Sequence, residues 1–163
     1  MKQLLLCLCV LISSLVFSQE QFVITEDGLS PRFIAIDVES NTYTKVLDWL
    51  VANMENYDIT IVETIENKSI QFTSEKGNAT NLDKQYFNAK YGIILHFTTN
   101  QFTFEPTAID LKQNSKYDMG WKPIDLNAGA PYFKNGKPIR KFRAYLYGIV
   151  APLNSLSLKL MTN

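Results

Sequence analysis

The chain has 163 residues, of which 46% are hydrophobic and 20% charged, and its 16 basic and 16 acidic side chains cancel. This length is enough for one domain with a sizeable core, and no linker rich in Gly, Ser or Pro divides the chain. The balanced charge argues against a nucleic-acid-binding protein, because such proteins present a basic excess to the phosphate backbone.

The first residues have the layout of a secretory signal peptide. Lys2 precedes an apolar run over residues 4–12, and the small Ser18 stands before Gln19, where a signal peptidase would cut. The run is too short to span a bilayer, which takes about 20 apolar residues. We therefore expect residues 1–18 to be removed, leaving a secreted or periplasmic chain without a transmembrane segment.

Both cysteines, Cys7 and Cys9, lie inside this leader. The mature chain then has no disulfide, so its stability must come from packing. Because the two cysteines stand within the apolar core of the leader rather than after it, we expect no lipid attachment to them.

Two short strands open the mature chain. We expect them at residues 22–25 and 33–38, joined by a turn at residues 26–31, where Gly28 and Pro31 favour a change of direction. In the second strand every other residue is apolar, which predicts one buried face. That face would carry Ile34, Ile36 and Val38.

The clearest element is a helix over residues 43–54, with a candidate N-cap in residues 40–42. Its apolar residues recur at helical spacing and form one stripe. The stripe consists of Tyr43, Val46, Leu47, Leu50, Val51 and Met54. Trp49 lies at its edge.

Four further strands are expected as two antiparallel hairpins, because each pair is separated by a short turn. The first pair is residues 59–65 and 70–73, and the second is residues 91–97 and 102–105, with a polar loop at 76–84 between the pairs. Apolar residues alternate along them, so one face of the sheet should be packed. Tyr91, Ile93, Leu95 and Phe97 share that face.

The last third of the chain is less regular. Residues 111–136 read as a long irregular segment. A helix is expected from Pro138, which suits a first helical turn, and Pro152 should kink or restart it. A strand over residues 142–150 is the alternative.

Taken in order, these elements resemble a family of uncharacterised exported proteins of the Bacteroidetes, a domain of unknown function with a TATA-binding-protein-like (TBP-like) fold. The resemblance rests on Ser18-Gln19, on residues 41–54 with Trp49, and on the hairpins at 59–72 and 91–104. It covers residues 22–109, and residues 110–163, with the irregular segment and C-terminal helix, lie outside it. It implies an α+β fold in β-α-β-β-β-β-α order, a curved antiparallel sheet with helices packed on one face. It implies no activity, cofactor or site.

Charge is unevenly distributed along the mature chain. Residues 19–111 hold 6 basic and 14 acidic side chains, and residues 112–163 hold 9 basic and 2 acidic ones. We expect the basic tail to dock onto the acidic body of a single domain over residues 19–163. The alternative is a surface that binds an anion or a partner.

Two groups of residues are candidates for ligand binding. Aromatic side chains in the irregular segment can form a platform for a sugar or peptide, although they more often pin a loop to its domain. These are Tyr117, Trp121 and Tyr132. The second group is basic and stands at the start of the expected helix, where cations oppose the helix dipole. It comprises Arg140, Lys141 and Arg143.

No nucleophile motif, phosphate loop or set of metal ligands occurs, so we expect no cofactor and no metal site. The sequence favours a non-catalytic binding or accessory domain of the cell envelope, whose partner is an envelope protein, a glycan or an anionic ligand. One alternative is a hydrolase built from dispersed carboxylates and His96, with Glu63 interrupting the apolar face of its strand. Another is a structural envelope component.

Overall fold

The computed structural model describes residues 20–37 and 42–162. The predicted leader, residues 1–18, lies outside these residues, as do Val38 of the predicted strand and residues 40 and 41 of the predicted N-cap. Among the described residues, no helix is long and apolar enough to cross a membrane.

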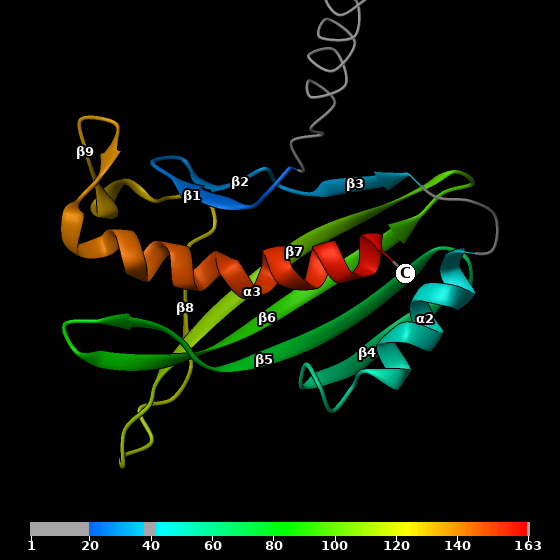
Figure 1. The fold of residues 1–163 in the computed structure, drawn as a ribbon, viewed down its shortest axis with the longest axis horizontal. Coiled ribbons are helices and arrows are strands. Elements are labelled where there is room, and N and C mark those ends of the chain that lie inside the picture. The colour runs from blue at the N-terminus through cyan, green and yellow to red at the C-terminus, as the bar shows by residue number, and fades with distance from the viewer. Residues whose placement is uncertain (1–19, 38–41, 163) are drawn as a thin grey trace, which may run out of the picture.

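The main sheet has six strands and is antiparallel throughout (Figure 1). In spatial order they are β3 (Ile34–Asp37), β7 (Gln101–Gln113), β6 (Gln85–Phe97), β5 (Ser69–Leu82) and β4 (Ile59–Ile65), with β8 (Lys122–Pro123) paired to the far end of β7. The predicted α+β class and its large antiparallel sheet are confirmed.

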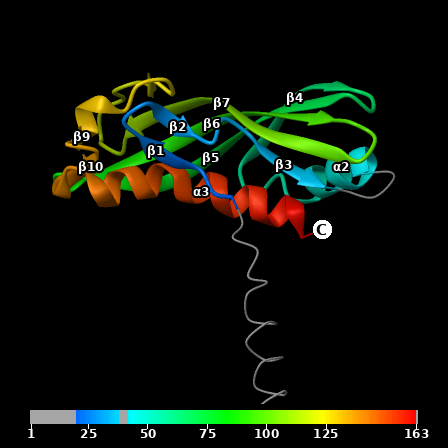
Figure 2. The same ribbon diagram turned by 90° about the horizontal axis from the view of Figure 1, so that it is seen from above.

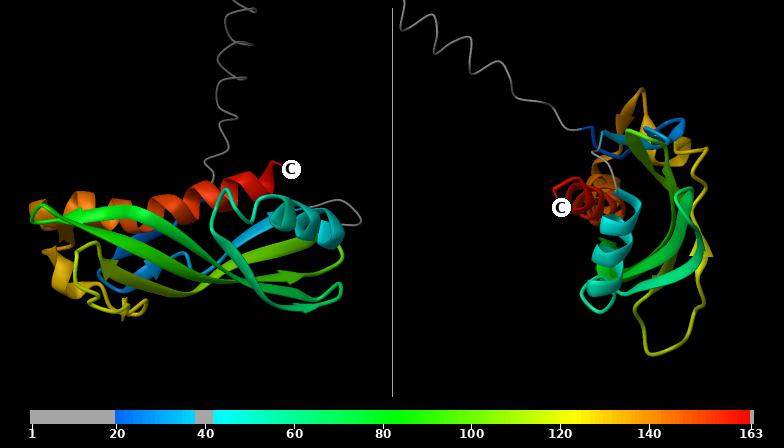
Figure 3. Two further views of the ribbon diagram at one scale, coloured as in Figure 1. Left: turned by 90° about the horizontal axis from the view of Figure 1, so that it is seen from below. Right: turned by 90° about the vertical axis from the view of Figure 1, so that its right-hand side faces the viewer.

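Two helices, α2 (Thr42–Ala52) and α3 (Arg143–Met161), lie on the same face of this sheet. Figure 3 shows the sheet curving around α3, which runs along most of its length, while α2 covers the end near β4. The opposite face, here called the outer face, carries no helix of the described chain.

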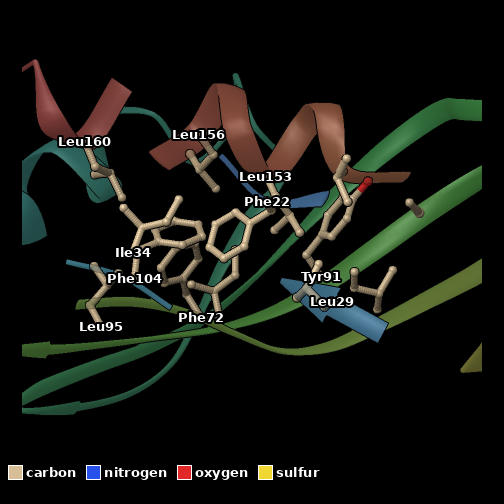
Figure 4. Packing of buried hydrophobic residues seen from close by; sticks show 14 of the residues in the cluster. Phe22, Leu29, Ile34, Phe72, Tyr91, Leu95, Phe104, Leu153, Leu156 and Leu160 are labelled. Atoms are coloured by element: carbon tan, nitrogen blue, oxygen red, sulfur yellow. The ribbon is translucent and has the colours of Figure 1, made fainter. Parts of the chain in front are cut away.

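The core fills the space between α3 and the sheet. Figure 4 shows Phe22, Phe104 and Leu153 meeting there, and all three are fully buried. The alternation predicted for β3 and β6 is confirmed, because one set of side chains in each strand is buried. These are Ile34, Ile36, Tyr91, Ile93 and Leu95.

Side chains from the sheet hydrogen-bond to the backbone of α3. The hydroxyl of Thr80 donates to the carbonyl of Tyr145 at 2.7 Å, and the hydroxyl of Tyr91 donates to the carbonyl of Ile149 at 2.9 Å. Between these contacts lies Gly148, where an added Cβ would stand 2.7 Å from the carbonyl oxygen of Ala79. The helix and β5 therefore approach each other as closely as a glycine permits.

The start of the described chain is also attached to α3. The side chain of Asn154 accepts a hydrogen bond from the N–H of Phe22 and donates one to its carbonyl. This fixes the segment that leads into β1 (Val23–Thr25), which forms a hairpin with β2 (Gly28–Ser30).

That hairpin corrects the prediction of a single turn over residues 26–31. Gly28 adopts a φ of 99°, in the left-handed region, and its Cβ position is filled by the carbonyl of Leu126. The sequence places Gly28 in a turn, whereas in the structure it is the first residue of β2. That strand lies against the loop that contains Leu126.

The helix α2 is shorter than predicted and its buried stripe is narrower. It ends at Ala52, and only Val46 and Leu50 are fully buried. Val51 and Met54 are 53% and 37% exposed. The stripe is narrow because α2 covers the end of the sheet rather than its middle, so only one edge of the helix meets the core.

The prediction of a polar loop at residues 76–84 is wrong. Strand β5 continues through it, with a register shift between Lys76 and Thr80. The chain turns only at Asp83 and Lys84, which have φ values of 51° and 68°. Polar residues do not end the strand, because its ladder with β6 supplies the backbone hydrogen bonds.

A β-bulge also corrects the expected position of Glu63. The register of β4 against β5 shifts between Ile61 and Glu63, so Glu63 stands opposite Gln71 on the outer face. The extra residue reverses the alternation, and the Glu63 side chain is exposed rather than core-facing.

The C-terminal helix is present, and the alternative strand over residues 142–150 is wrong. It begins at Arg143 rather than at Pro138, which instead belongs to the short strand β10 (Lys137–Pro138) paired with β9 (Phe133–Lys134). The short helices η1 (Ala130–Tyr132) and η2 (Arg140–Phe142) flank this hairpin. Pro152 stands inside α3, which continues past it to Met161.

Candidate ligand-binding site

The loop after β7 folds onto the outer face of the sheet. The ring of Trp121 lies 5.9 Å from Nζ of Lys90 and 6.0 Å from Nζ of Lys112. Asp118 accepts a hydrogen bond from Lys112 at 2.8 Å and another from the N–H of Gly120. These two bonds, with the Lys112 charge, hold the pKa of the Asp118 carboxyl below its usual value. Trp121 thus pins this loop to the sheet.

Tyr117 does not join Trp121 in a platform. Its side chain is 66% exposed, and the nearest cation is Lys116, whose Nζ lies 5.0 Å from its ring centre. The structure therefore separates the predicted aromatic group, with Tyr117 and Trp121 in the outer loop and Tyr132 elsewhere.

Tyr132 belongs to an aromatic cluster at the start of α3. Its ring centre lies 5.2 Å from that of Phe142 and 5.8 Å from that of Tyr145. Phe87 of β6 packs edge-on against Tyr145 at 6.2 Å. Rings from a loop, a strand and a helix therefore meet at one end of the molecule.

Beside this cluster is a cavity of about 380 Å³, which lies within the range of small-ligand sites. Its lining comes from β6, β7, the start of α3 and the segment between residues 119 and 132. The apolar lining includes Phe87, Leu111, Met119, Ile124, Tyr132 and Tyr145. We call this the aromatic cavity.

A few polar groups converge on the aromatic cavity. Gln113, Lys122 and Asp125 line it, which provides an amide, a cation and a carboxylate around an apolar wall. Burial raises the pKa of Tyr145 above its ordinary value, and the neighbouring Tyr132 phenol raises it further. The Tyr145 phenol therefore stays neutral at physiological pH and serves the cavity as a hydrogen-bonding group rather than as a charge.

The basic candidates Arg140, Lys141 and Arg143 lie near this end of the molecule but do not line the aromatic cavity. All three side chains are exposed. The structure thus brings Tyr132 to the cavity and leaves the cations on the surface beside the start of α3.

A second cavity, of about 440 Å³, lies between α3 near Pro152 and the bulged part of β5. Two hydroxyl-bearing residues, Ser74 and Tyr91, are part of its lining. Each already donates to a backbone carbonyl, Ser74 to that of Tyr57 and Tyr91 to that of Ile149. Because these protons are engaged within the protein, the aromatic cavity is the better candidate for a ligand.

The residues proposed for a hydrolase are not assembled. Nε2 of His96 lies 3.9 Å from Oε2 of Glu105 on the outer face, where both side chains are about half exposed. Glu63 is on β4, with β5 between it and the strand of His96. Within residues 20–37 and 42–162, no group of three or more His, Cys, Asp or Glu side chains could hold a metal ion.

Comparison with known proteins defines the class of fold. No family of known proteins matches the chain, and no curated protein matches it either. The fold is similar to the crystal structure of a TBP-like protein from Parabacteroides distasonis, with a TM-score of 0.50 and 14% sequence identity over 80% of this chain and 90% of that one. The chain therefore has a TBP-like fold.

Several residues of the aromatic cavity escape prediction from sequence. Tyr145 has the helical spacing of an ordinary core residue, and Leu111 lies at the boundary of the segment predicted to be irregular. Phe87 precedes the expected start of its strand by several residues. The only sequence signal for the cavity is the density of aromatic residues between Tyr117 and Phe142.

Proposed function

We propose that the chain is an exported, non-catalytic binding domain that holds a glycan fragment in the aromatic cavity. The observation that carries this proposal is the lining itself, which combines the aromatic Tyr132 and Tyr145 with the charged Lys122 and Asp125. Aromatic faces pack against the apolar faces of sugar rings, while a carboxylate and an ammonium group suit hydroxyls. The volume of about 380 Å³ suits one or two sugar units.

Export is supported by the position of the first buried residue among those that the structure describes. Phe22 is fully buried and bonded to Asn154, whereas Glu20 and Gln21 are exposed. A cut after Ser18 would therefore remove the leader and leave every described core residue in place. N-terminal sequencing of protein from the periplasm or medium should give Gln19, and an intact Met1 would contradict export.

Ligand binding is tested by saturation-transfer NMR with a panel of defined sugars, namely glucose, N-acetylglucosamine, maltose and chitobiose. We expect at least one sugar to receive saturation from the protein. Tyr132→Ala should weaken its binding at least about tenfold, or roughly 1.4 kcal/mol.

The matched control is Tyr147→Ala, because Tyr147 is also near the start of α3 but is 73% exposed and does not line the cavity. It should leave sugar binding unchanged. Absence of transfer to every sugar, or an equal loss in both variants, would rule out a glycan in this cavity.

A further inference from the structure

We infer that the end of the molecule formed by β9, β10 and the start of α3 docks on an anionic phospholipid surface. Five cations fall within a short stretch of sequence there, and no Asp or Glu follows Asp125. All five side chains are exposed. They are Lys134, Lys137, Arg140, Lys141 and Arg143. We call this group the basic corner.

The fold brings these cations close together, and this lowers its stability locally. A turn at Asn135 and Gly136, with φ values of 52° and 72°, places Lys134 directly opposite Lys137, and like charges facing each other across a strand pair are destabilising. Arg140 and Arg143 then stand at the N-terminal end of a helix, where the dipole disfavours positive charge.

No ion pair of the described residues offsets this loss of stability, and the contact made by one of these cations is with a ring, Nζ of Lys141 lying 4.7 Å from the ring centre of Phe142. The ion pairs between residues of 20–37 and 42–162 are those of Lys90, His96 and Lys112, and none reaches the basic corner. The carboxylate of Glu26 approaches the hairpin, but it accepts a hydrogen bond from the N–H of Gly136. The predicted docking of the basic tail onto the acidic body is therefore not seen at these residues.

Charge is segregated along the longest axis of the molecule. Figures 1 and 2 show β9 and the start of α3 at one end and α2 with β4 at the other. The second end carries five acidic side chains against two lysines, Lys45 and Lys68; the acidic residues are Asp48, Glu55, Asp58, Glu63 and Glu66. Since the whole chain has a formal charge of +0, it would approach an anionic surface with the basic corner first.

The shape of the basic corner favours a surface over a compact anion. Its cations are spread over a hairpin, a short helix and the first turn of α3, and none of them lines either cavity. One helical turn after Arg143 stands Tyr147, which is 73% exposed. A tyrosine with an apolar ring and a polar tip is suited to the lipid–water interface.

The test measures co-sedimentation of the purified chain with vesicles. Vesicles of phosphatidylcholine mixed with phosphatidylglycerol should bind it in low salt and release it in high salt, and pure phosphatidylcholine vesicles should not bind it. Each cation near such a surface raises binding roughly fivefold. The triple variant Lys134→Gln, Arg140→Gln and Lys141→Gln should therefore bind about a hundredfold more weakly.

A charge-matched control carries Lys45→Gln, Lys68→Gln and Lys76→Gln, which are exposed cations away from the basic corner. It should bind anionic vesicles as well as the unchanged chain or better. Both triple variants should keep the native circular dichroism spectrum, so lost binding cannot be attributed to unfolding.

Three results would overturn the inference. If neutral vesicles bind the chain as well as anionic ones do, the binding is due to apolar contacts. If the control triple variant loses as much binding as the first triple variant, the binding is due to net charge alone. Salt-sensitive self-association without vesicles, lost in the first triple variant, would assign the basic corner to the acidic end of a second copy. The sugar experiment is independent, because the two sites share no residue.

Discussion

The side-chain amide of Asn154 satisfies both backbone groups of Phe22, accepting from its N–H at 2.7 Å and donating to its carbonyl at 3.0 Å. An asparagine side chain carries the same acceptor and donor as a peptide group. At Phe22, α3 therefore does what a neighbouring strand would do in a sheet, and it joins the first and last parts of the fold.

Loss of this contact should destabilise the whole chain. Asn154→Ala removes two hydrogen bonds and leaves partly buried backbone groups unpaired, which should lower the free energy of unfolding by about 1–3 kcal/mol. The melting temperature should fall by about 3 °C for each kcal/mol. Asn81→Ala, at an exposed position in β5, is the control, and equal melting temperatures for the two variants would refute the role of Asn154.

Neighbouring positions in α2 should respond in opposite ways to the same substitution. Leu50 is fully buried and Val51 is 53% exposed. Leu50→Asp places an unpaired charge in the core and should unfold the chain, since such a cost rivals the total stability of a domain. Val51→Asp should cost less than about 1 kcal/mol. Chemical denaturation compares them, and a native-like Leu50→Asp would disprove the position of α2.

Gly148 should be intolerant of a methyl group, although alanine is normally the better helix former by about 1 kcal/mol. Its Cβ would stand 2.7 Å from both the Ala79 carbonyl oxygen and Oγ1 of Thr80. We expect Gly148→Ala to destabilise the chain by about 1–3 kcal/mol, as measured by urea unfolding. Ser155→Ala, at an exposed position of the same helix, should not, and stabilisation by Gly148→Ala would show that α3 and β5 are not in close contact.

Stability should decrease in alkali because of two buried phenols. Burial raises the pKa of Tyr91 and of Tyr145 above their ordinary value of 10.0. A group whose pKa is raised by folding contributes its full stability below the unfolded pKa and loses it as the pH rises towards the folded pKa. The free energy of unfolding should therefore fall above about pH 10, by up to roughly 1.4 kcal/mol per pH unit for each phenol.

Tyr91→Phe separates this effect from general alkaline damage. At neutral pH it should cost about 1 kcal/mol, since the hydrogen bond to the Ile149 carbonyl is lost. Above pH 10 its stability should fall less steeply than that of the unchanged chain. Tyr147→Phe, at an exposed position, should match the unchanged chain, and an equal alkaline slope in all three would contradict a buried neutral phenol at Tyr91.

The parts of the fold that were predictable from sequence are those where side-chain burial follows a fixed period. Tyr91, Ile93 and Leu95 alternate with more exposed residues, and Val46 and Leu50 are one helical turn apart. Each pattern arises because one face of the element is buried, and the period of the apolar residues indicates which face that is. For this reason the order of strands and helices was predictable.

Strand lengths and the cavity were not predictable, because they depend on partners distant in sequence. The ladder between β5 and β6 carries strand structure through Lys76 and Asn81, whose side chains give no local signal for it. Likewise, periodicity indicates that Tyr145 is buried but not that Phe87 and Tyr132 lie beside it. Of the predicted binding residues, only Tyr132 lines the aromatic cavity, since a density of aromatic residues does not specify where each ring points.

The bond between Phe22 and Asn154 also affects when the chain can fold. Core residues from the first strand region need α3, which lies more than a hundred residues later in the chain, at Arg143–Met161. While a ribosome still covers α3, the part of the apolar face beyond α2 has no helix packed on it. The nascent chain therefore cannot complete its core until α3 has emerged and packed on the sheet.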